Sequence, residues 1–191
     1  VPPLYVASDE LLSRLSDYVK TGGHMLMAFK SGFADENSTI RWVRAPGPLR
    51  QACGFSYQEF SNLPAPVRLK GDPFEAGEGN TVSVWAEYLM PETAMPLAFY
   101  DHPEFGKYPA LTRNNFGKGS LTYEGTFLSD GLQDKVVLDT LRAAAVPMAD
   151  KGLPSPVKAE HARLAAGAAV HAFFNYSGRP QKFNYGYLPG S

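Results

Sequence analysis

The chain has 191 residues, 44% of them hydrophobic and 13% aromatic, which is enough for one ordinary domain with a small appendage. Its formal net charge of −1 gives no electrostatic reason to expect nucleic acid or an anionic membrane as a partner. No apolar run reaches the ~20 residues that a membrane span needs. The single cysteine excludes an internal disulfide.

The first six residues, Val1 to Val6, have neither the basic start nor the long apolar region of a signal peptide. They are typical of the end of a strand that leads into a helix. Because the chain starts at valine and ends on a Pro-Gly-Ser segment, we expect it to be a piece of a longer protein.

A helix is predicted after Ser8, which can cap it, and a buried strand is predicted at 25–29. Two acidic residues open the helix, Lys20 lies in its last turn, and Gly22 with Gly23 can end it. One apolar stripe is expected to face the core, formed by Leu11, Leu12, Leu15, Tyr18 and Val19. This order of elements is half of an α/β unit.

A long loop, Lys30 to Pro48, follows the first strand, and loops of this length are usually functional or form interfaces. A short helical turn is predicted at 49–53. Further strands are predicted at 55–60, 67–70, 81–88 and 94–100, with a hairpin at 108–114 and 120–126. In the 81–88 strand, alternation predicts one shared face for Val82, Val84, Ala86 and Tyr88.

A second helix is predicted from Ser129 or Asp130 to about Ala145, ended by Pro147. Its expected apolar set is Leu132, Val136, Val137, Leu141 and Ala144. Composition then shifts to a linker at 148–156. Three short β runs beyond it, at 157–164, 168–176 and 180–185, indicate the start of a small antiparallel domain.

The residues offer little catalytic chemistry. Cys53 has no neighbouring histidine and no helix N-terminus to lower its pKa, so a buried hydrophobic role is favoured. The four histidines lack metal-site spacing, and although His161 and His171 can meet across a hairpin, we favour an ordinary cross-strand pair. No metal site, catalytic residue or cofactor is expected in this chain.

Other candidates have equally plain explanations. Asp35 and Glu36 are the best carboxylate pair, but neighbours on a loop more often cap turns or meet arginines than catalyse glycoside hydrolysis. The Phe116–Gly119 run lies in a hairpin rather than before a helix, which favours a tight turn over a phosphate cradle. Strand aromatics such as Trp85 suit half-buried positions as well as a sugar-stacking surface.

Several motifs occur in a familiar order: LYVASDELLSRLSDYVKTGGHMLMAFKSGFADEN, PGPLRQACGF, YQEF, VSVWAEYL and PALTRNNFGKGSLTYEGT. From Pro3 to about Val146 the chain resembles the middle, trimerisation domain of bacterial family 42 glycoside hydrolases, the β-galactosidases. The PGPLR and TRNNFGKG stretches are the most specific parts. The tail from Val157 is similar to the start of that family's small C-terminal β domain.

The resemblance implies an α/β fold of the flavodoxin-like, class I glutamine-amidotransferase-like three-layer type, followed by part of an antiparallel β domain. It implies boundaries at 1–147, 148–156 and 157–191, with the first βα unit of the α/β domain missing. The family's two catalytic glutamates belong to a TIM barrel that cleaves terminal β-D-galactosides with retention, and that barrel is outside this chain. The parent is expected to be a cytoplasmic bacterial enzyme.

We therefore expect a non-catalytic domain that builds a homotrimer and also contacts the TIM barrel of its parent, with no nucleic-acid or membrane partner. The subunit contact is predicted on the long loop, at Asp35, Glu36, Asn37, Arg41, Trp42, Pro46 and Pro48. Two alternatives stay open. One is a stand-alone amidotransferase-like enzyme that uses Cys53, although the Gly-x-Cys-x-Gly elbow is absent. The other is a carbohydrate-binding module that uses Trp42 or Trp85.

Overall fold

The computed structural model describes residues 1–146, 153–165 and 167–184. The chain divides into two compact units, Val1–Ala145 and Val146–Ser191, and each is described by itself. Of the predicted linker at 148–156, residues 148–152 lie outside the described residues, as does Pro147.

Helix α1, Asp9–Lys20, begins where its sequence predicts, because the Ser8 hydroxyl accepts a hydrogen bond from the Leu11 N–H at 3.2 Å. Its buried side chains are Leu12 and Val19. The wider apolar stripe was wrong at two positions, since Leu11 and Tyr18 are exposed. The helix is therefore covered over a narrow face only.

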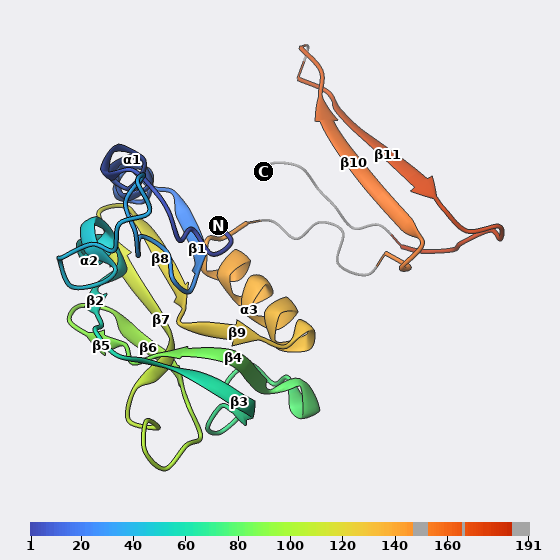
Figure 1. Ribbon diagram of the computed structural model, residues 1–191. Coiled ribbons are helices and arrows are strands. Elements are labelled where there is room, and N and C mark those ends of the chain that lie inside the picture. Colours follow the sequence, from blue (N-terminus) through green and yellow to red (C-terminus); the bar gives the residue numbers. More distant parts are fainter. Residues whose placement is uncertain (147–152, 166, 185–191) are drawn as a thin grey trace. The chain divides into compact units, whose positions relative to one another are not determined.

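A four-stranded sheet forms the centre of the first unit, in the order β1-β8-β7-β6 (Figure 1). The strands are β1 (His24–Ala28), β8 (Gly119–Glu124), β7 (Pro109–Phe116) and β6 (Met95–Phe99). Strands β1 and β8 are parallel, with Met27 opposite Tyr123, and the other neighbours are antiparallel. The sheet is mixed, with one parallel pair.

Helices lie on both faces of the β1–β8 pair (Figure 1). On one face, Met25 and Met27 pack with α1, the 3-10 helix η1 (Gly47–Leu49) and α2 (Arg50–Cys53). On the other face, Leu26 packs against the core that contains Leu132 of α3 (Asp130–Ala143). Ser129 caps α3 as predicted, whereas Val137, expected on its apolar side, is 37% exposed.

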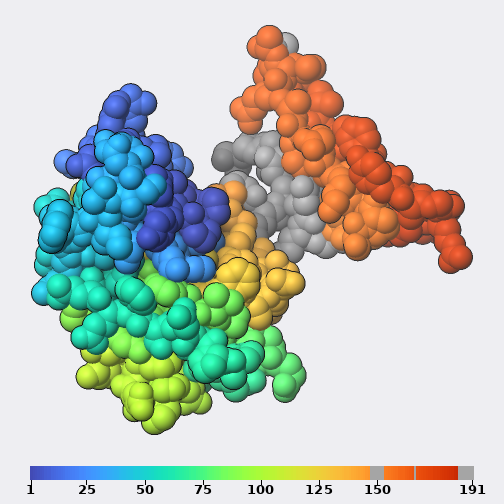
Figure 2. Space-filling view, viewed as in Figure 1, coloured from blue at the N-terminus to red at the C-terminus, as the bar shows by residue number. Residues whose placement is uncertain are grey.

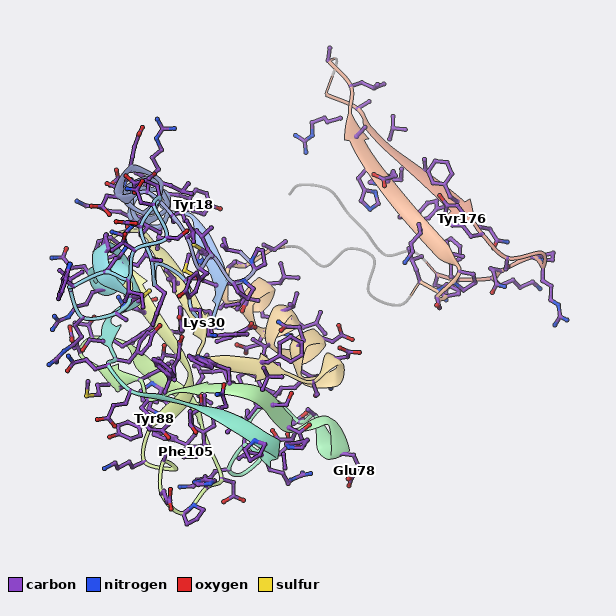
Figure 3. The ribbon with its side chains drawn as sticks, viewed as in Figure 1. Tyr18, Lys30, Glu78, Tyr88, Phe105 and Tyr176 are labelled. Carbon is purple, nitrogen blue, oxygen red and sulfur yellow. The ribbon has the colours of Figure 1, made fainter. Side chains whose placement is uncertain are left out.

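A second, three-stranded sheet has the order β3-β4-β9, from Phe60–Arg68, Thr81–Glu87 and Thr126–Leu128. A two-stranded ladder pairs β2 (Phe55–Ser56) with β5 (Met90–Pro91), and a 3-10 turn, η2 (Gly77–Gly79), precedes β4. Beside these strands, the rings of Tyr88 and Phe105 stack 5.3 Å apart (Figure 3).

The predicted alternation in β4 was wrong at Val84, which is 58% exposed and has φ +66°. The register of β4 against β9 shifts between Ser83 and Ala86, so the strand carries a bulge there. Beyond the bulge, Trp85, Ala86 and Glu87 are all buried. The bulge thus turns a glutamate into the interior, which simple alternation does not anticipate.

The second unit contains one hairpin, β10 (Val157–Arg163) with β11 (Ala169–Asn175), in its described part. His161 lies opposite His171, and their Nδ1 atoms are 2.8 Å apart, which confirms the expected cross-strand pair. The third β run was wrong over 180–184, which form no strand, and residue 185 lies outside the described residues. No helix in the described segments is long and apolar enough to cross a membrane.

Candidate subunit interface

The loop from Lys30 to Pro48, called here the interface loop, leaves the end of β1 through a turn at Lys30, whose φ is +57°. The Ser31 hydroxyl donates to the Ala28 carbonyl at 2.7 Å and accepts from the Leu4 N–H at 3.2 Å. Gly32 N–H donates to the Leu4 carbonyl at 2.9 Å. The loop therefore starts from a fixed position beside the N-terminal segment.

A tight turn follows, organised by one carboxylate. The Asp35 carboxylate accepts hydrogen bonds from the Asn37 and Thr39 N–H groups, each at 2.9 Å. The Asp35 N–H donates to the Thr39 carbonyl at 2.9 Å. Asp35 thus shapes the turn, while Glu36 and Asn37 project into solvent.

Arg41 points inward and braces the loop against α1. Its guanidinium forms an ion pair with Asp9, in the first turn of α1, and donates to the Ala7 carbonyl at 2.6 Å. The Arg41 side chain is only 10% exposed. Arg41 was predicted to lie at a subunit contact, and its internal partners show that it also holds the loop in place against α1.

The next residue, Trp42, is fully exposed, with a relative accessibility of 100%. Ile40 and Val43, on either side of the Arg41–Trp42 pair, are 58% and 60% exposed. The segment from Ile40 to Arg44 lines two hollows, of about 540 and 190 Å³. An apolar projection between hollows is typical of a surface that another protein covers.

The far end of the loop is tied to the domain. The Tyr57 N–H donates to the Ala45 carbonyl at 2.9 Å, and the peptide bond that follows, Ala45–Pro46, is cis. Pro46 is buried whereas Pro48 is exposed. Among the predicted interface residues, the side chains that face solvent are therefore those of Glu36, Asn37, Trp42 and Pro48. In Figure 2 the light-blue atoms of this region form part of the outer surface.

Glu87 is fully buried and contacts the first residue of the interface loop, and sequence reasoning did not assign it this place. Its carboxylate accepts hydrogen bonds from the Lys30 N–H at 2.7 Å, the Tyr123 hydroxyl at 2.9 Å and, more weakly, the Trp85 indole at 3.4 Å. Burial raises the pKa of Glu87 to about 7, while these donors lower it in part. The sequence signal that could have located it is a glutamate inside the apolar run VSVWAEYL.

The structure opposes the enzymatic alternative, and it opposes Trp85 but not the exposed Trp42 as the platform of a carbohydrate-binding module. Cys53 is completely buried, and that burial raises the pKa of its thiol far above the usual range, which opposes an exposed, thiolate-like nucleophile. Trp85 is 7% exposed, with Phe60 stacked on it at 4.3 Å, so it offers no face to a sugar. Within the described residues, no group of three or more His, Cys, Asp or Glu side chains could hold a metal.

Comparison with known proteins gives the family of the first unit. Residues 1–147 match the family model described as the β-galactosidase trimerisation domain. β-Galactosidase Bga of Halorubrum lacusprofundi is 34% identical over 168 residues, covering 82% of this chain and 24% of the relative. β-Galactosidase BgaH of Haloferax lucentense is 35% identical over 152 residues, covering 78% and 22%.

Solved structures agree with these matches. The β-galactosidase from the Antarctic haloarchaeon Halorubrum lacusprofundi superimposes with a TM-score of 0.68 and 30% identity over 92% of this chain and 25% of that one. The β-galactosidase from Rahnella sp. R3 gives a TM-score of 0.76 and 25% identity over 99% and 28%. The chain thus spans about a quarter of the length of its relatives. The resemblance predicted from the motifs is confirmed: the chain belongs to the β-galactosidase trimerisation domain family.

Proposed function

We propose that this chain mediates the assembly of a homotrimer and that the interface loop makes the subunit contact. The observation that carries the proposal is Trp42, whose side chain is fully exposed on a loop held at both ends. A solvated tryptophan on a rigid support loses little conformational entropy when a partner covers it, which makes it a suitable anchor. The description of the family as a trimerisation domain supports three copies as the assembly.

For the whole protein we propose a cytoplasmic retaining β-galactosidase whose catalytic TIM barrel lies outside this chain and is a second partner of this domain. The relatives named above are β-galactosidases about four times as long as the matched region, which supports this reading. Terminal β-D-galactosides are the proposed substrates of that barrel. On this proposal the present chain alone does not hydrolyse them.

We further propose that the first unit is a flavodoxin-like, amidotransferase-like three-layer domain that ends near residue 147. The parallel pairing of β1 with β8 and the helices on both faces of that pair support this class. Residues 148–156 are the proposed linker. The hairpin of β10 and β11 is then the beginning of an antiparallel β domain at 157–191.

The test is the mass of the chain in solution, measured by light scattering on a sizing column. A trimer has a mass of three times 20.8 kDa, about 62 kDa. Trp42→Ala is expected to shift the mass toward 20.8 kDa at concentrations where the parent sequence stays trimeric. Arg41→Ala is a less selective test, because it also removes the internal ion pair with Asp9.

A matched control is Met95→Ala. Met95 is 59% exposed, on β6 at the opposite edge of the sheet from β1. Its truncation removes a comparable exposed apolar group and should leave the trimer intact. A trimer that survives Trp42→Ala, or one that dissociates equally in both variants, would contradict the assignment of the interface to this loop.

A further inference from the structure

The hairpin of β10 and β11 (Figure 1) carries two histidines in direct contact. His161 of β10 is the register partner of His171 of β11, and their Nδ1 atoms lie 2.8 Å apart. The ring centroids are 4.9 Å apart and the ring planes meet at 65°. The two imidazoles therefore approach each other through their nitrogen atoms rather than stacking face to face.

The backbone pattern explains why the two side chains come so close. The Leu164 N–H donates to the Ala168 carbonyl at 2.8 Å, which makes these two residues a hydrogen-bonded pair. Hydrogen-bonded and non-hydrogen-bonded pairs alternate along an antiparallel ladder, and His161 with His171 lies three positions away, at a non-hydrogen-bonded pair. Side chains are closest together at such pairs. The strand register itself thus sets the separation of the two rings.

The 2.8 Å separation suits two adjacent ligands of one transition-metal ion. Histidine nitrogen binds such ions at about 2.0–2.1 Å, so two nitrogens at a right angle around the ion lie about 2.9 Å apart. Two nitrogens of a tetrahedral site lie about 3.4 Å apart. Right angles are typical of the square-planar and tetragonal sites that Cu(II) and Ni(II) form with nitrogen and oxygen ligands. The pair therefore fits these ions better than Zn(II).

Both Nδ1 atoms can become ligands without a change in total charge on the side chains. Without a metal, one imidazole donates its Nδ1–H to the Nδ1 of the other. On metal binding that hydrogen moves to Nε2 of the same ring, by exchange with water, so that each Nδ1 offers a lone pair. The hydrogen bond between the rings is then replaced by two bonds to the same ion.

The described neighbours add no further ligand. Side chains two residues apart on a strand share a face, and the described neighbours on this face are Ala159, Arg163, Ala169 and Phe173. None of these side chains is a usual metal ligand, so water completes the coordination. The hairpin still favours binding, because the second nitrogen is already in place when the first one binds the ion.

We propose that His161 and His171 form a bidentate site for Cu(II), and more weakly for Ni(II), in which the ion joins β10 to β11. Sequence alone favours an ordinary pair at these positions, because it does not contain the distance between the two rings. The inference is independent of the assembly role proposed above. Since a two-stranded hairpin is only marginally stable by itself, an ion that binds both strands should also order it.

Titration of the full chain with copper(II) chloride at about pH 7.5 tests the proposal, with isothermal calorimetry as the readout. One equivalent is expected to bind, and the electron paramagnetic resonance spectrum of the complex should show splitting from two equatorial nitrogens. His161→Ala and His171→Ala each remove one ligand and should weaken binding about 100-fold. Binding by either variant as tight as that of the parent overturns the proposal.

A register-shifted variant is the matched control. His171→Ala/Ala172→His keeps the number of histidines but moves one to the opposite face of the hairpin, since successive side chains alternate. It should bind copper as weakly as His171→Ala. His24→Ala removes a single exposed histidine that contacts Ser120 and should leave binding unchanged. Tight binding by the shifted variant would mean adventitious copper only, and would overturn the proposal.

Amide hydrogen exchange tests whether the ion joins the two strands. One equivalent of copper should slow exchange of the β10 and β11 amides in the parent, leave the β8 amides unchanged, and have no effect in the shifted variant. Copper that binds without slowing exchange in the hairpin overturns the cross-strand site. If the variants lose the hairpin altogether, the parent spectrum decides, and fewer than two nitrogens on the bound copper overturns the proposal.

Discussion

Gly119 packs directly on the backbone of Gly23, where a β-carbon at position 119 would lie 2.0 Å from the Gly23 carbonyl oxygen. The Ser120 N–H donates to that same carbonyl at 3.2 Å, and the Lys118 N–H donates to the Lys20 carbonyl at 3.0 Å. The turn between β7 and β8 therefore docks on the turn between α1 and β1. This contact explains why the FGKG run belongs to a tight turn and why its glycines are required.

Gly119→Ala is consequently expected to destabilise the first unit by about 3 kcal/mol or more, because the added methyl group meets rigid backbone that cannot move aside. Urea unfolding followed by circular dichroism measures the loss. Gly131→Ala is the control, since a β-carbon there meets nothing closer than 3.9 Å. Equal stabilities for the two variants would show that the docking of the two turns is not tight.

Features that depend only on residues close together in the chain were the ones best predicted from the sequence. Ser8 and Ser129 cap α1 and α3 because each hydroxyl bonds an N–H three residues along the chain. The Lys30–Pro48 loop was recognisable from its length and its Pro and Gly content. By contrast, the exposure of Val84 depends on a bulge set by pairing with β9, which is more than 40 residues further along the chain. No short window contains that information.

Long-range contacts explain why the remaining features of the candidate site were not predicted from the sequence. Trp42 and Arg41 are neighbours in an irregular loop, so no periodicity assigns one to solvent and the other to an ion pair with Asp9. The bond between Glu87 and the Lys30 N–H spans 57 residues. Motif order identified the family, but only the fold shows which loop residues face outward.

Glu87 should make the free energy of unfolding of the chain depend on pH. Its folded-state pKa of about 7 exceeds the ordinary 4.5, so the folded chain holds the proton more tightly than the unfolded chain does. The contribution of Glu87 to the free energy of unfolding should be largest below pH 4.5, fall as the pH rises to about 7, and then level off. The full change is up to about 3 kcal/mol.

Comparing urea unfolding of the parent and Glu87→Gln at each pH cancels the other titrating groups. The free energy of unfolding of Glu87→Gln, minus that of the parent, should rise steadily from pH 4.5 to pH 7 and stay constant above pH 7. If the difference between the two proteins were constant across this range, the burial of an ionisable Glu87 would be refuted.

Asn114 joins three segments from a buried position on β7. Its side-chain amide donates to the carbonyls of Gln51 and Ala52, at 3.1 and 3.0 Å, and accepts from the Thr93 hydroxyl at 3.0 Å. Asn114→Ala leaves these groups without a partner and should cost about 3 kcal/mol in thermal or urea unfolding. Asn115→Ala, at the exposed neighbouring position, should change little, and a similar loss in both would contradict this role.

Cys53 provides a test of the enzymatic alternative. The thiol is completely inside the core of α2 and its neighbours, and burial raises its pKa, so little thiolate exists in the folded chain at neutral pH. Iodoacetamide should therefore label it only as fast as the first unit opens, and urea at the unfolding midpoint should accelerate labelling by orders of magnitude. Mass spectrometry follows the reaction. The 191-residue chain has no other cysteine, so any label added to cysteine reports this site alone. Rapid labelling of the folded chain at pH 7 would instead mean a reactive, accessible thiol, and would return the amidotransferase-like reading to consideration.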